Sequence, residues 1–305
     1  MITTFAQLEE KVKNLPPVTI VIAAAEDKKV TGLAKLAREK GFIKKAILTG
    51  NSDEIKAVLN ELGEPLDFYE IVHTDDDRTA AVEAVKAVRE GRAQILVKGR
   101  LETVYYLKAI LDKENGVAAS KVLSNLTMLE MPSYHKFICV TDNAIMPLPN
   151  VEEKKLIALN VAPLMKAIEV ERPKVAALSA LEVVNPKVPS TVDADALQTM
   201  SRNGEMGNFI VEGPIAYDIA ISKEASAGKK HVSEVAGEPD ILLMPNLEAA
   251  NILTKAYKFH AQANSGGLVM GAKVPVVLNS RSDDAERRLN SLMMAMAIDS
   301  VMKNS

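Results

Sequence analysis

Short apolar runs alternate with segments of helical period through the first half of the chain, and this alternation restricts the fold more than any other feature. Predicted strands lie at Val18–Ala25, Lys45–Thr49 and Tyr69–His73. Predicted helices lie at Val30–Lys40 and Thr79–Glu90, and a third, with Ser52 or Asp53 as its N-cap, runs through Leu62. Strands that alternate with helices form largely parallel sheets with helices on their faces. The pattern therefore predicts an α/β fold.

The alternation continues through the rest of the chain. Predicted strands there are Gln94–Lys98, Lys136–Thr141, Lys174–Leu181, Phe209–Val211, Asp240–Met244 and Val274–Leu278. Predicted helices are Val104–Leu111, Val151 to about Val170, Ala194–Arg202, Leu247–Phe259 and Ala285 to about Met302. A chain of 305 residues exceeds the roughly 100 to 200 residues of one domain. We predict two α/β domains that meet in a turn near Pro132–Lys136, because no Gly/Ser-rich linker is present.

A glycine-rich and then polar stretch, Asn264–Asp284, is the strongest candidate for a binding site. Its glycines precede the apolar run Val274–Leu278, which is followed by Ser280 and Arg281. Open α/β sheets bind ligands beyond the carboxyl ends of their strands, and arginine presents a fork of donors that matches phosphate or carboxylate. We therefore predict an anion site. A structural alternative stays open, in which Ser280 caps the last helix and Arg281 is a solvated charge.

Polar or basic residues also follow two other predicted strands. They are Gly99–Arg100, with Thr103 in the next helix, and Gly213–Pro214, with Asp218 beyond them. Gly-Pro after a strand predicts a tight reversal. Each set has a ligand-binding interpretation and a structural one, since a threonine or an aspartate is also common in the first turn of a helix.

Composition argues against several classes of protein. With a net charge of −3, the chain has no general attraction to nucleic acid or to an acidic membrane. The single cysteine, Cys139, permits no intramolecular disulfide and fits a reducing cytoplasm. No signal-peptide pattern opens the chain, and no run reaches the roughly 18 apolar residues of a membrane span. We expect a cytoplasmic protein that binds neither nucleic acid nor membrane.

Common catalytic and metal-binding motifs are missing. The four histidines are far apart, and none has the spacing of a zinc site, so no metal is predicted. Neither a nucleophile elbow nor a phosphate-binding P-loop occurs. The first strand ends in Ala23–Glu26 instead of Gly-x-Gly-x-x-Gly, which argues against a dinucleotide site. His135 stays a functional candidate because it lies in the predicted inter-domain turn.

Three segments taken together resemble one enzyme family. Val211–Ala220, Pro245–Lys255 and Pro275–Arg281 are similar to motifs of the phosphate acetyl/butyryltransferase family and occur in the family's order. The segment Pro132–Lys136, with Val140–Asp142, resembles the butyryl branch more than the acetyl branch. The similarity covers nearly the full chain.

The resemblance implies a specific architecture. It is two three-layer α/β domains with mostly parallel sheets, similar to isocitrate and isopropylmalate dehydrogenases, with the active site in the inter-domain cleft. Because the last helix of the family returns to the first domain, the implied domains are residues 1–135 plus 274–305 and residues 136–273. A homodimer or larger homo-oligomer is also implied.

The resemblance implies a reaction too. Acyl-CoA and phosphate would give acyl phosphate and CoA, reversibly, by direct attack in a ternary complex without a covalent acyl-enzyme. Its partners would be acyl-CoA, phosphate and acyl phosphate, with a butyryl or similar acyl group and no tightly bound cofactor. The sequence agrees, because Cys139 lies inside a predicted strand and no activated serine is evident.

Site residues follow from the family motifs. Ser280 and Arg281 would bind phosphate or polarise the carbonyl, with Thr103 and the Gly99 loop on the facing side. The implied substrate-binding residues are Gly99, Arg100, Thr103, Gly213, Pro214, Asp218, Asn251, Lys255, Gly266 and Gly267.

Two positions depart from acetyl-type enzymes. Those enzymes carry an aspartate, the proposed thiol base, seven residues after the motif serine, where this chain has Arg287. The adjacent Glu286 is the candidate catalytic replacement, although one residue of offset on a helix turns a side chain by about 100°. The acetyl-type arginine two residues after the matching threonine is Tyr105 here, and Arg100 is a candidate for its role.

Two other functions compete with the transferase. Related domains serve as regulatory appendages of malic enzymes, so a catalytically silent acyl-CoA-binding module is the main alternative. An NAD-dependent decarboxylating dehydrogenase would share the two-domain shape, but its paired metal-binding aspartates are missing. The preferred acyl chain stays open, because a pocket discriminates one methylene by only about 1 to 3 kcal/mol. The oligomeric state is also open.

Overall fold

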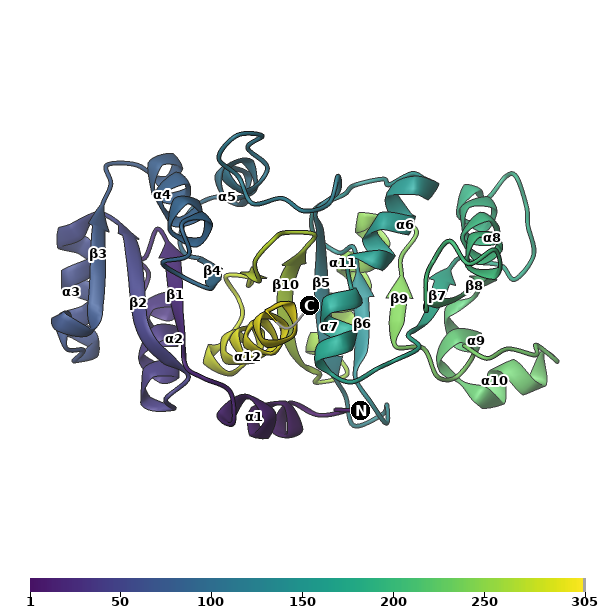
Figure 1. Ribbon diagram of the computed structural model, residues 1–305. Helices are drawn as coiled ribbons and strands as arrows, with labels where there is room; N and C mark the ends of the chain where they lie inside the picture. Colours follow the sequence, from purple (N-terminus) through teal and green to yellow (C-terminus); the bar gives the residue numbers. More distant parts are fainter. Residues whose placement is uncertain (304–305) are drawn as a thin grey trace. The chain divides into compact units, whose positions relative to one another are not determined.

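The computed structural model describes residues 1–303, which form two compact units (Figure 1). The N-terminal unit consists of Phe5–Ala119 and of the chain from Gly266 onward. The central unit consists of Met1–Thr4 and Ser120–Ser265. The chain thus returns to the N-terminal unit inside the glycine-rich stretch. The predicted α/β class is confirmed in both units.

The N-terminal unit contains a mostly parallel sheet with the strand order β3-β2-β1-β4-β11-β10. Its strands are β1 (Val18–Ala23), β2 (Ile43–Gly50), β3 (Tyr69–His73), β4 (Ile95–Lys98), β10 (Asn264–Met270) and β11 (Val276–Val277). Its helices are α1 (Phe5–Lys13), α2 (Lys28–Glu39), α3 (Ser52–Leu62), α4 (Asp77–Arg89), α5 (Thr103–Ile110) and α12 (Ala285–Met302), with a 3-10 turn at Leu66–Phe68. Strand β10 is antiparallel to β11, whereas β4 is parallel to both β1 and β11.

The chain reverses its direction of travel across this sheet after β3. It first adds β2 and β3 on one side of β1, and then crosses back so that β4 pairs with the other side. Because such crossovers are right-handed, α4 lies on the opposite face from α2 and α3. Helix α2 accordingly packs beside α3 and α12, and α4 packs beside α5. The carboxyl ends of β1 and β4 therefore border a topological switch point, where open α/β sheets bind ligands.

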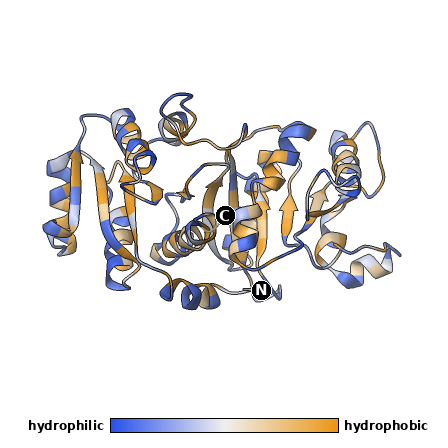
Figure 2. Ribbon diagram, in the orientation of Figure 1, coloured by the Kyte–Doolittle hydropathy of each residue, from blue (hydrophilic) through white to orange (hydrophobic). Residues whose placement is uncertain are grey.

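Local sequence explains where several of these elements begin and end. Asp27, Asn51 and Asp76 are the N-caps of α2, α3 and α4, and each accepts a hydrogen bond from a backbone amide of its first turn. The predicted cap of α3, Ser52 or Asp53, is therefore wrong, because the Asn51 side chain accepts from the amides of Asp53 and Glu54. Gly63 ends α3 in the left-handed conformation, with φ 69°. Strand β1 is buried along its whole length and hydrophobic except for Thr19, as expected when helices cover both faces (Figure 2).

Gly266 and Gly267, two of the three glycines of the stretch Asn264–Asp284, lie in a strand, β10, which the sequence does not predict. A Cβ on Gly266 would lie 2.5 Å from the Met294 sulfur and 3.0 Å from the Ser291 nitrogen of α12. The Gly267 amide donates to the Ser291 hydroxyl at 2.8 Å. The missing Cβ of Gly266 thus lets α12 approach the strand closely. Although α12 has 18 residues, neither it nor another helix of residues 1–303 is long and apolar enough to span a membrane.

The central unit contains a second mostly parallel arrangement, with the strand order β5-β6-β9-β7-β8. Its strands are β5 (Ser124–Glu130), β6 (Ile138–Thr141), β7 (Lys174–Leu178), β8 (Ile210–Ile215) and β9 (Ile241–Leu243). Its helices are α6 (Val151–Leu159), α7 (Ala162–Ala167), α8 (Pro189–Arg202), α9 (Tyr217–Ile221), α10 (Lys223–Gly228) and α11 (Leu247–Phe259). Its core includes Ile138, Leu242 and Ile219, all at most 1% exposed.

The predicted domain boundary falls inside the central unit. Strands β5 and β6 pair antiparallel, and Pro132–Lys136 lies in the connection between them. The long segment of the central unit runs from Ser120 to Ser265, and both of its ends come earlier in the chain than the predicted boundaries after residues 135 and 273. The sequence does not reveal β5, because Ser124–Glu130 lacks the β-branched enrichment of a typical strand.

Two predicted elements of the central unit are wrong. The single helix predicted from Val151 to about Val170 is two helices, because Pro163 at the start of α7 has no N–H to continue the first. The reversal predicted at Gly213–Pro214 is absent, and β8 continues through both residues to Ile215. Gly213 is required for close packing, since a Cβ there would lie 2.8 Å from the Ala177 Cβ.

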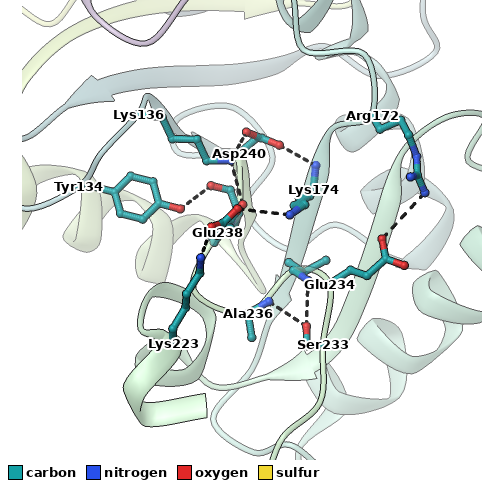
Figure 3. Close-up of polar contacts among 12 residues, drawn as sticks. Tyr134, Lys136, Arg172, Lys174, Lys223, Ser233, Glu234, Ala236, Glu238 and Asp240 are labelled. Carbon is teal, nitrogen blue, oxygen red and sulfur yellow. Dashed lines mark hydrogen bonds and ion pairs between the residues drawn. The ribbon is translucent and has the colours of Figure 1, made fainter. Parts of the chain in front are cut away.

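A buried ion pair joins residues at the start of three strands of the central unit (Figure 3). The Lys136 ammonium lies 2.5 Å from Asp240 Oδ1 and donates to the Glu238 carbonyl at 2.9 Å. Asp240 Oδ2 accepts from the Lys174 amide at 2.8 Å. The Lys136 and Asp240 side chains are only 7% and 8% exposed. The segment that resembles the butyryl branch therefore contains a residue that holds β6, β7 and β9 together.

Other polar contacts surround this ion pair (Figure 3). The Tyr134 hydroxyl donates to the Pro239 carbonyl at 2.7 Å. Lys223 and Lys174 both pair with Glu238, and their ammonium groups lower the pKa of Glu238 to about 2. The connection from β5 to β6 is thus anchored by side chains on both sides of His135.

Candidate active site

A glycine, Gly99, lies at the switch point of the N-terminal unit, where the chain leaves β4 beside the end of β1. Gly99 and Arg100 follow β4, and their amides donate to the carbonyls of Ala23 and Ala24 at 2.8 Å each. A Cβ on Gly99 would lie 2.1 Å from the Ala24 oxygen and 2.3 Å from the Ala23 oxygen. Only glycine lets the chain leave β4 this close to the end of β1. Gly99 therefore shapes the edge of the sheet where a ligand is expected.

The loop after β11 reaches the same edge, because β11 is parallel to β4. Within this loop, buried Asp283 accepts from the Ser280 amide at 2.9 Å and from the Asn279 side chain at 3.3 Å. Buried Arg288 of α12 donates to the carbonyls of Ser280 and Asp283 at 3.1 and 3.3 Å. The loop is thus fixed at both ends by side chains that face inward.

Ser280 and Arg281 are presented outward by this loop. Both are exposed. The Ser280 hydroxyl lies 3.0 Å from the Ser282 hydroxyl. Within residues 1–303, Arg281 forms no ion pair and its guanidinium donates no hydrogen bond. The predicted anion-binding arginine therefore has all its donors available for a ligand.

Positive charge accumulates at this edge of the sheet. Lys98 is the last residue of β4, and its pKa is lowered first by burial and then by the charges of Arg281 and Arg288, against the opposing charge of Asp77. Burial also lowers the pKa of Arg288, which Asp283 opposes. Positive charges gathered at one place favour the binding of an anion.

Three other residues in or just after the Gly99 loop, Arg100, Thr103 and Tyr105, have environments that differ from that of Gly99. Arg100 forms an exposed ion pair with Glu54 of α3 at 3.3 Å. Thr103 is the first residue of α5. Tyr105, at the position of the acetyl-type arginine, is 37% exposed on that helix. The structure therefore brings Gly99, Ser280 and Arg281 to one edge, whereas the Arg100 side chain contacts α3.

The first turn of α12 carries the candidate base. Asp284 is the N-cap, and its carboxylate accepts from the Arg287 amide at 2.9 Å. The Arg287 guanidinium lies 3.7 Å from the same carboxylate. Glu286 is exposed in this turn. Arg287 is thus held by Asp284, and Glu286 is the exposed carboxylate next to it.

The remaining predicted residues belong to the central unit or to β10. Gly213 and Pro214 are buried within β8, where packing accounts for them. Asp218 is in the first turn of α9, and its carboxylate lies 3.6 Å from Lys229. Gly266 and Gly267 are buried in β10 against α12.

Asn251 and Lys255 lie on α11, one turn apart. The Asn251 amide donates to the Asn143 carbonyl at 3.1 Å, and the Asn143 side chain donates to Thr254 at 3.1 Å. Asp142 precedes Asn143 and is buried, which raises the pKa of its carboxyl despite four backbone amide donors. The end of β6 thus carries a buried polar network, and Asn251 is one of its members.

Comparison with known proteins identifies the family. The family model described as "Phosphate acetyl/butaryl transferase" matches residues 72–296, which include the Gly99 loop, Ser280 and Arg281. The chain belongs to this family. It is therefore a phosphate acyltransferase, as the sequence motifs predict, and the alternative of a silent regulatory module has no support among its relatives.

Three relatives of this phosphate acyltransferase illustrate the similarity. Phosphate butyryltransferase of Clostridium acetobutylicum is 37% identical over 98% of this chain and 99% of its own length. Probable phosphate butyryltransferase of Bacillus subtilis is 40% identical over 91% of this chain and 92% of its own. The crystal structure of a branched-chain phosphotransacylase from Enterococcus faecalis has 32% identity and a TM-score of 0.81, and covers 92% of this chain and 99% of its own.

Three charged residues at the candidate site of this phosphate acyltransferase are not found from the sequence. Lys98 ends the apolar run Ile95–Val97, and a charge at a strand's carboxyl end is a signal that could reveal it. Asp283 and Arg288 are buried, which is rare for charged residues, so no pattern of exposed polar side chains identifies them. Their partners are backbone groups of the Ser280 loop, which only the fold brings together.

Proposed function

We propose that this phosphate acyltransferase reversibly transfers a short acyl group, butyryl or a similar one, between CoA and inorganic phosphate. The proposal includes the inter-domain active site and the homo-oligomer that the family resemblance implies. It also includes acyl-CoA, phosphate and acyl phosphate as ligands and the absence of a tightly bound cofactor.

One observation carries the proposal. Arg281 is exposed in the loop after β11, and its guanidinium has no internal partner in residues 1–303. Asp283 and Arg288 hold this loop in place. An arginine fork with free donors matches the paired oxygens of phosphate. Because the loop is fixed before a ligand arrives, little conformational freedom is lost on binding.

The chemistry needs orientation and charge stabilisation. An oxygen of phosphate attacks the thioester carbonyl carbon, the carbon–sulfur bond breaks, and the leaving sulfur takes a proton as free CoA. Positioning of two substrates supplies several kcal/mol, up to about 7 to 11 for ideal alignment. Arg281 would stabilise the negative charge that develops on the carbonyl and phosphate oxygens.

A covalent acyl-enzyme is not part of the proposal. Cys139 is buried in β6, and burial raises the pKa of its thiol well above the ordinary value. The Ser280 hydroxyl contacts Ser282, and within residues 1–303 no histidine or carboxylate side chain accepts its proton. A nucleophilic serine requires such a base. Direct attack of phosphate on acyl-CoA is the simpler route.

The acyl preference is argued from the relatives. Two of them are named for butyryl transfer and the crystal structure for branched-chain transfer. We propose that butyryl-CoA and isobutyryl-CoA are better substrates than acetyl-CoA. Rates measured with acetyl-, propionyl-, butyryl- and isobutyryl-CoA at one phosphate concentration test this ranking.

The activity itself is tested with purified protein and butyryl-CoA. CoA release, followed with a thiol reagent, is expected to depend on added phosphate and to saturate with it. Sulfate at the same ionic strength is the control for a salt effect. Release that does not depend on phosphate would contradict the proposal, and butyryl-CoA binding without turnover would favour the regulatory module.

The proposed base, Glu286, has a limited expected effect. A thiol with a pKa of about 8.5 is roughly one-thirtieth thiolate at pH 7, so removing its base costs at most about 30-fold. We expect Glu286→Gln to lower the rate of CoA acylation from butyryl phosphate within that limit at pH 7. The deficit should disappear near pH 9, where the thiol ionises unaided. A pH-rate profile checks this, and a deficit that persists at pH 9 would remove Glu286 from the role.

A further inference from the structure

Lys98 occupies the switch point of the N-terminal unit. It is the last residue of β4 and pairs in register with Ala23 of β1, the strand on the other side of the switch. Its side chain is half-buried, and its ammonium lies 3.4 Å from the Gly99 carbonyl. Within residues 1–303, no carboxylate forms an ion pair with it. Partial burial of a lysine that has no ion-pair partner is unfavourable, and such groups are usually compensated by a partner or a ligand.

The surroundings of Lys98 increase that cost. Arg281 and Arg288 are close enough to lower the pKa of Lys98, and Asp77 is the carboxylate that opposes them. Arg288 donates to the carbonyls of Ser280 and Asp283, so part of its hydrogen-bonding capacity is used by the protein. Within residues 1–303, Lys98 and Arg281 are the two cations of this group that form no ion pair with a carboxylate. An anion of high charge density would neutralise both.

The nearby Arg100 has a different environment. It lies two residues further along and is the sequence-based candidate for the arginine that acetyl-type enzymes carry at the position of Tyr105. Its guanidinium instead pairs with Glu54, and both side chains are about half exposed, at 51% and 54%. The cation that accompanies Arg281 therefore comes from β4 itself.

We propose that Lys98 is a phosphate-binding residue, whose ammonium donates a hydrogen bond to inorganic phosphate, or to the phosphoryl group of acyl phosphate, beside Arg281. This inference rests on the proposed function and adds a second cation to its site. Lys98 binds the anion as a compact charge, and Arg281 binds it through a planar fork.

The substitution Lys98→Gln tests the role by steady-state kinetics. A hydrogen bond to a charged group is worth enough to raise the KM for phosphate by roughly 10- to 100-fold when it is lost. The KM for butyryl-CoA is expected to change by no more than about twofold. Lys98→Arg, which keeps the charge, should recover most of the phosphate affinity. An equal rise in both KM values would overturn the proposal.

The pH dependence provides a readout that a merely structural residue would not change. Because the pKa of Lys98 is lowered by burial and by Arg281 and Arg288, against Asp77, its charge is lost at a lower pH than for an ordinary lysine. The KM for phosphate should therefore rise on the alkaline side in the wild type. In Lys98→Arg that rise should move to higher pH, since arginine stays protonated. If the KM for phosphate rises at the same alkaline pH in Lys98→Arg as in the wild type, Lys98 is not a phosphate-binding residue.

Two controls separate the possible failures. Lys44 is exposed near the start of β2, at the amino ends of the parallel strands and away from the candidate site. Lys44→Gln removes the same charge as Lys98→Gln and should leave both KM values unchanged. Protection by inorganic phosphate against thermal unfolding reports binding without turnover, and it should be weaker in Lys98→Gln than in the wild type. Inactive wild-type protein would refute the proposed function. Active wild type with a larger effect from Arg100→Gln than from Lys98→Gln would refute this inference alone.

Discussion

Replacing Arg281 with alanine is expected to lower kcat for phosphate-dependent release of CoA from butyryl-CoA by about two to three orders of magnitude. Removal of one preorganised donor that faces developing negative charge costs an enzyme about that much. Arg281 has no internal partner in residues 1–303, so its loss should leave the fold intact. Steady-state kinetics of the variant, with circular dichroism as a check of folding, provides the measurement.

Two variants complete this experiment. Arg281→Lys keeps the charge but not the fork and should retain an intermediate rate. Arg92→Ala removes an exposed arginine that pairs with Glu70, just ahead of β4 at the opposite edge of the sheet, and should have wild-type kinetics. If Arg281→Ala retains more than a tenth of the wild-type kcat, the guanidinium does not stabilise the transition state.

Replacing Lys136 with methionine is expected to lower the free energy of unfolding of the central unit by about 3 to 5 kcal/mol. The substitution leaves the Asp240 carboxylate buried at 8% exposure without its ammonium partner. Denaturant unfolding measures the loss, and hydrogen exchange of the β6 and β9 amides assigns it to the central unit.

The controls for Lys136 lie in the same group of residues (Figure 3). Arg172 and Glu234 form an exposed pair at 3.9 Å, and Arg172→Met should change the stability little. In the double variant Lys136→Met/Asp240→Asn, the neutral amide still accepts from the Lys174 backbone, so most of the stability should return. A double variant as unstable as Lys136→Met would show that the buried charge is not the cause.

Sequence periodicity predicts the elements whose pattern is strong. Helices α11 and α12 and strand β3 coincide with their predicted ranges. Strands β5 and β10 are missed because polar residues and glycines interrupt the apolar pattern, and tertiary packing makes strands of them. Gly266 is an example. A side chain at this position would clash with Met294, which is distant in sequence, so the need for glycine comes from tertiary packing.

The site is predictable to the same extent. Ser280, Arg281 and Gly99 stand out because they follow apolar runs, and the structure places them at one edge of the N-terminal sheet. Asp283 and Arg288 act through backbone groups of a loop, and no sequence spacing encodes such contacts. In Pro132–Lys136, by contrast, a segment that resembles the butyryl branch contains a residue with a structural role. Lys136 forms an ion pair with Asp240 and donates to the Glu238 carbonyl, and these contacts stabilise the central unit.

The division of the chain into units also determines the order in which they can form during synthesis. Residues 120–265 of the central unit form one continuous segment. The Ile2 amide joins this segment by donating a hydrogen bond to the Ile168 carbonyl at 2.9 Å. The N-terminal unit needs β11 and α12, which the ribosome adds only after residue 265. Since domains fold largely as their chain emerges, the central unit can mature first although it comes second. The strand next to β4 and the Ser280–Arg281 loop then arrive together, so a nascent chain has no anion site before its sheet is complete.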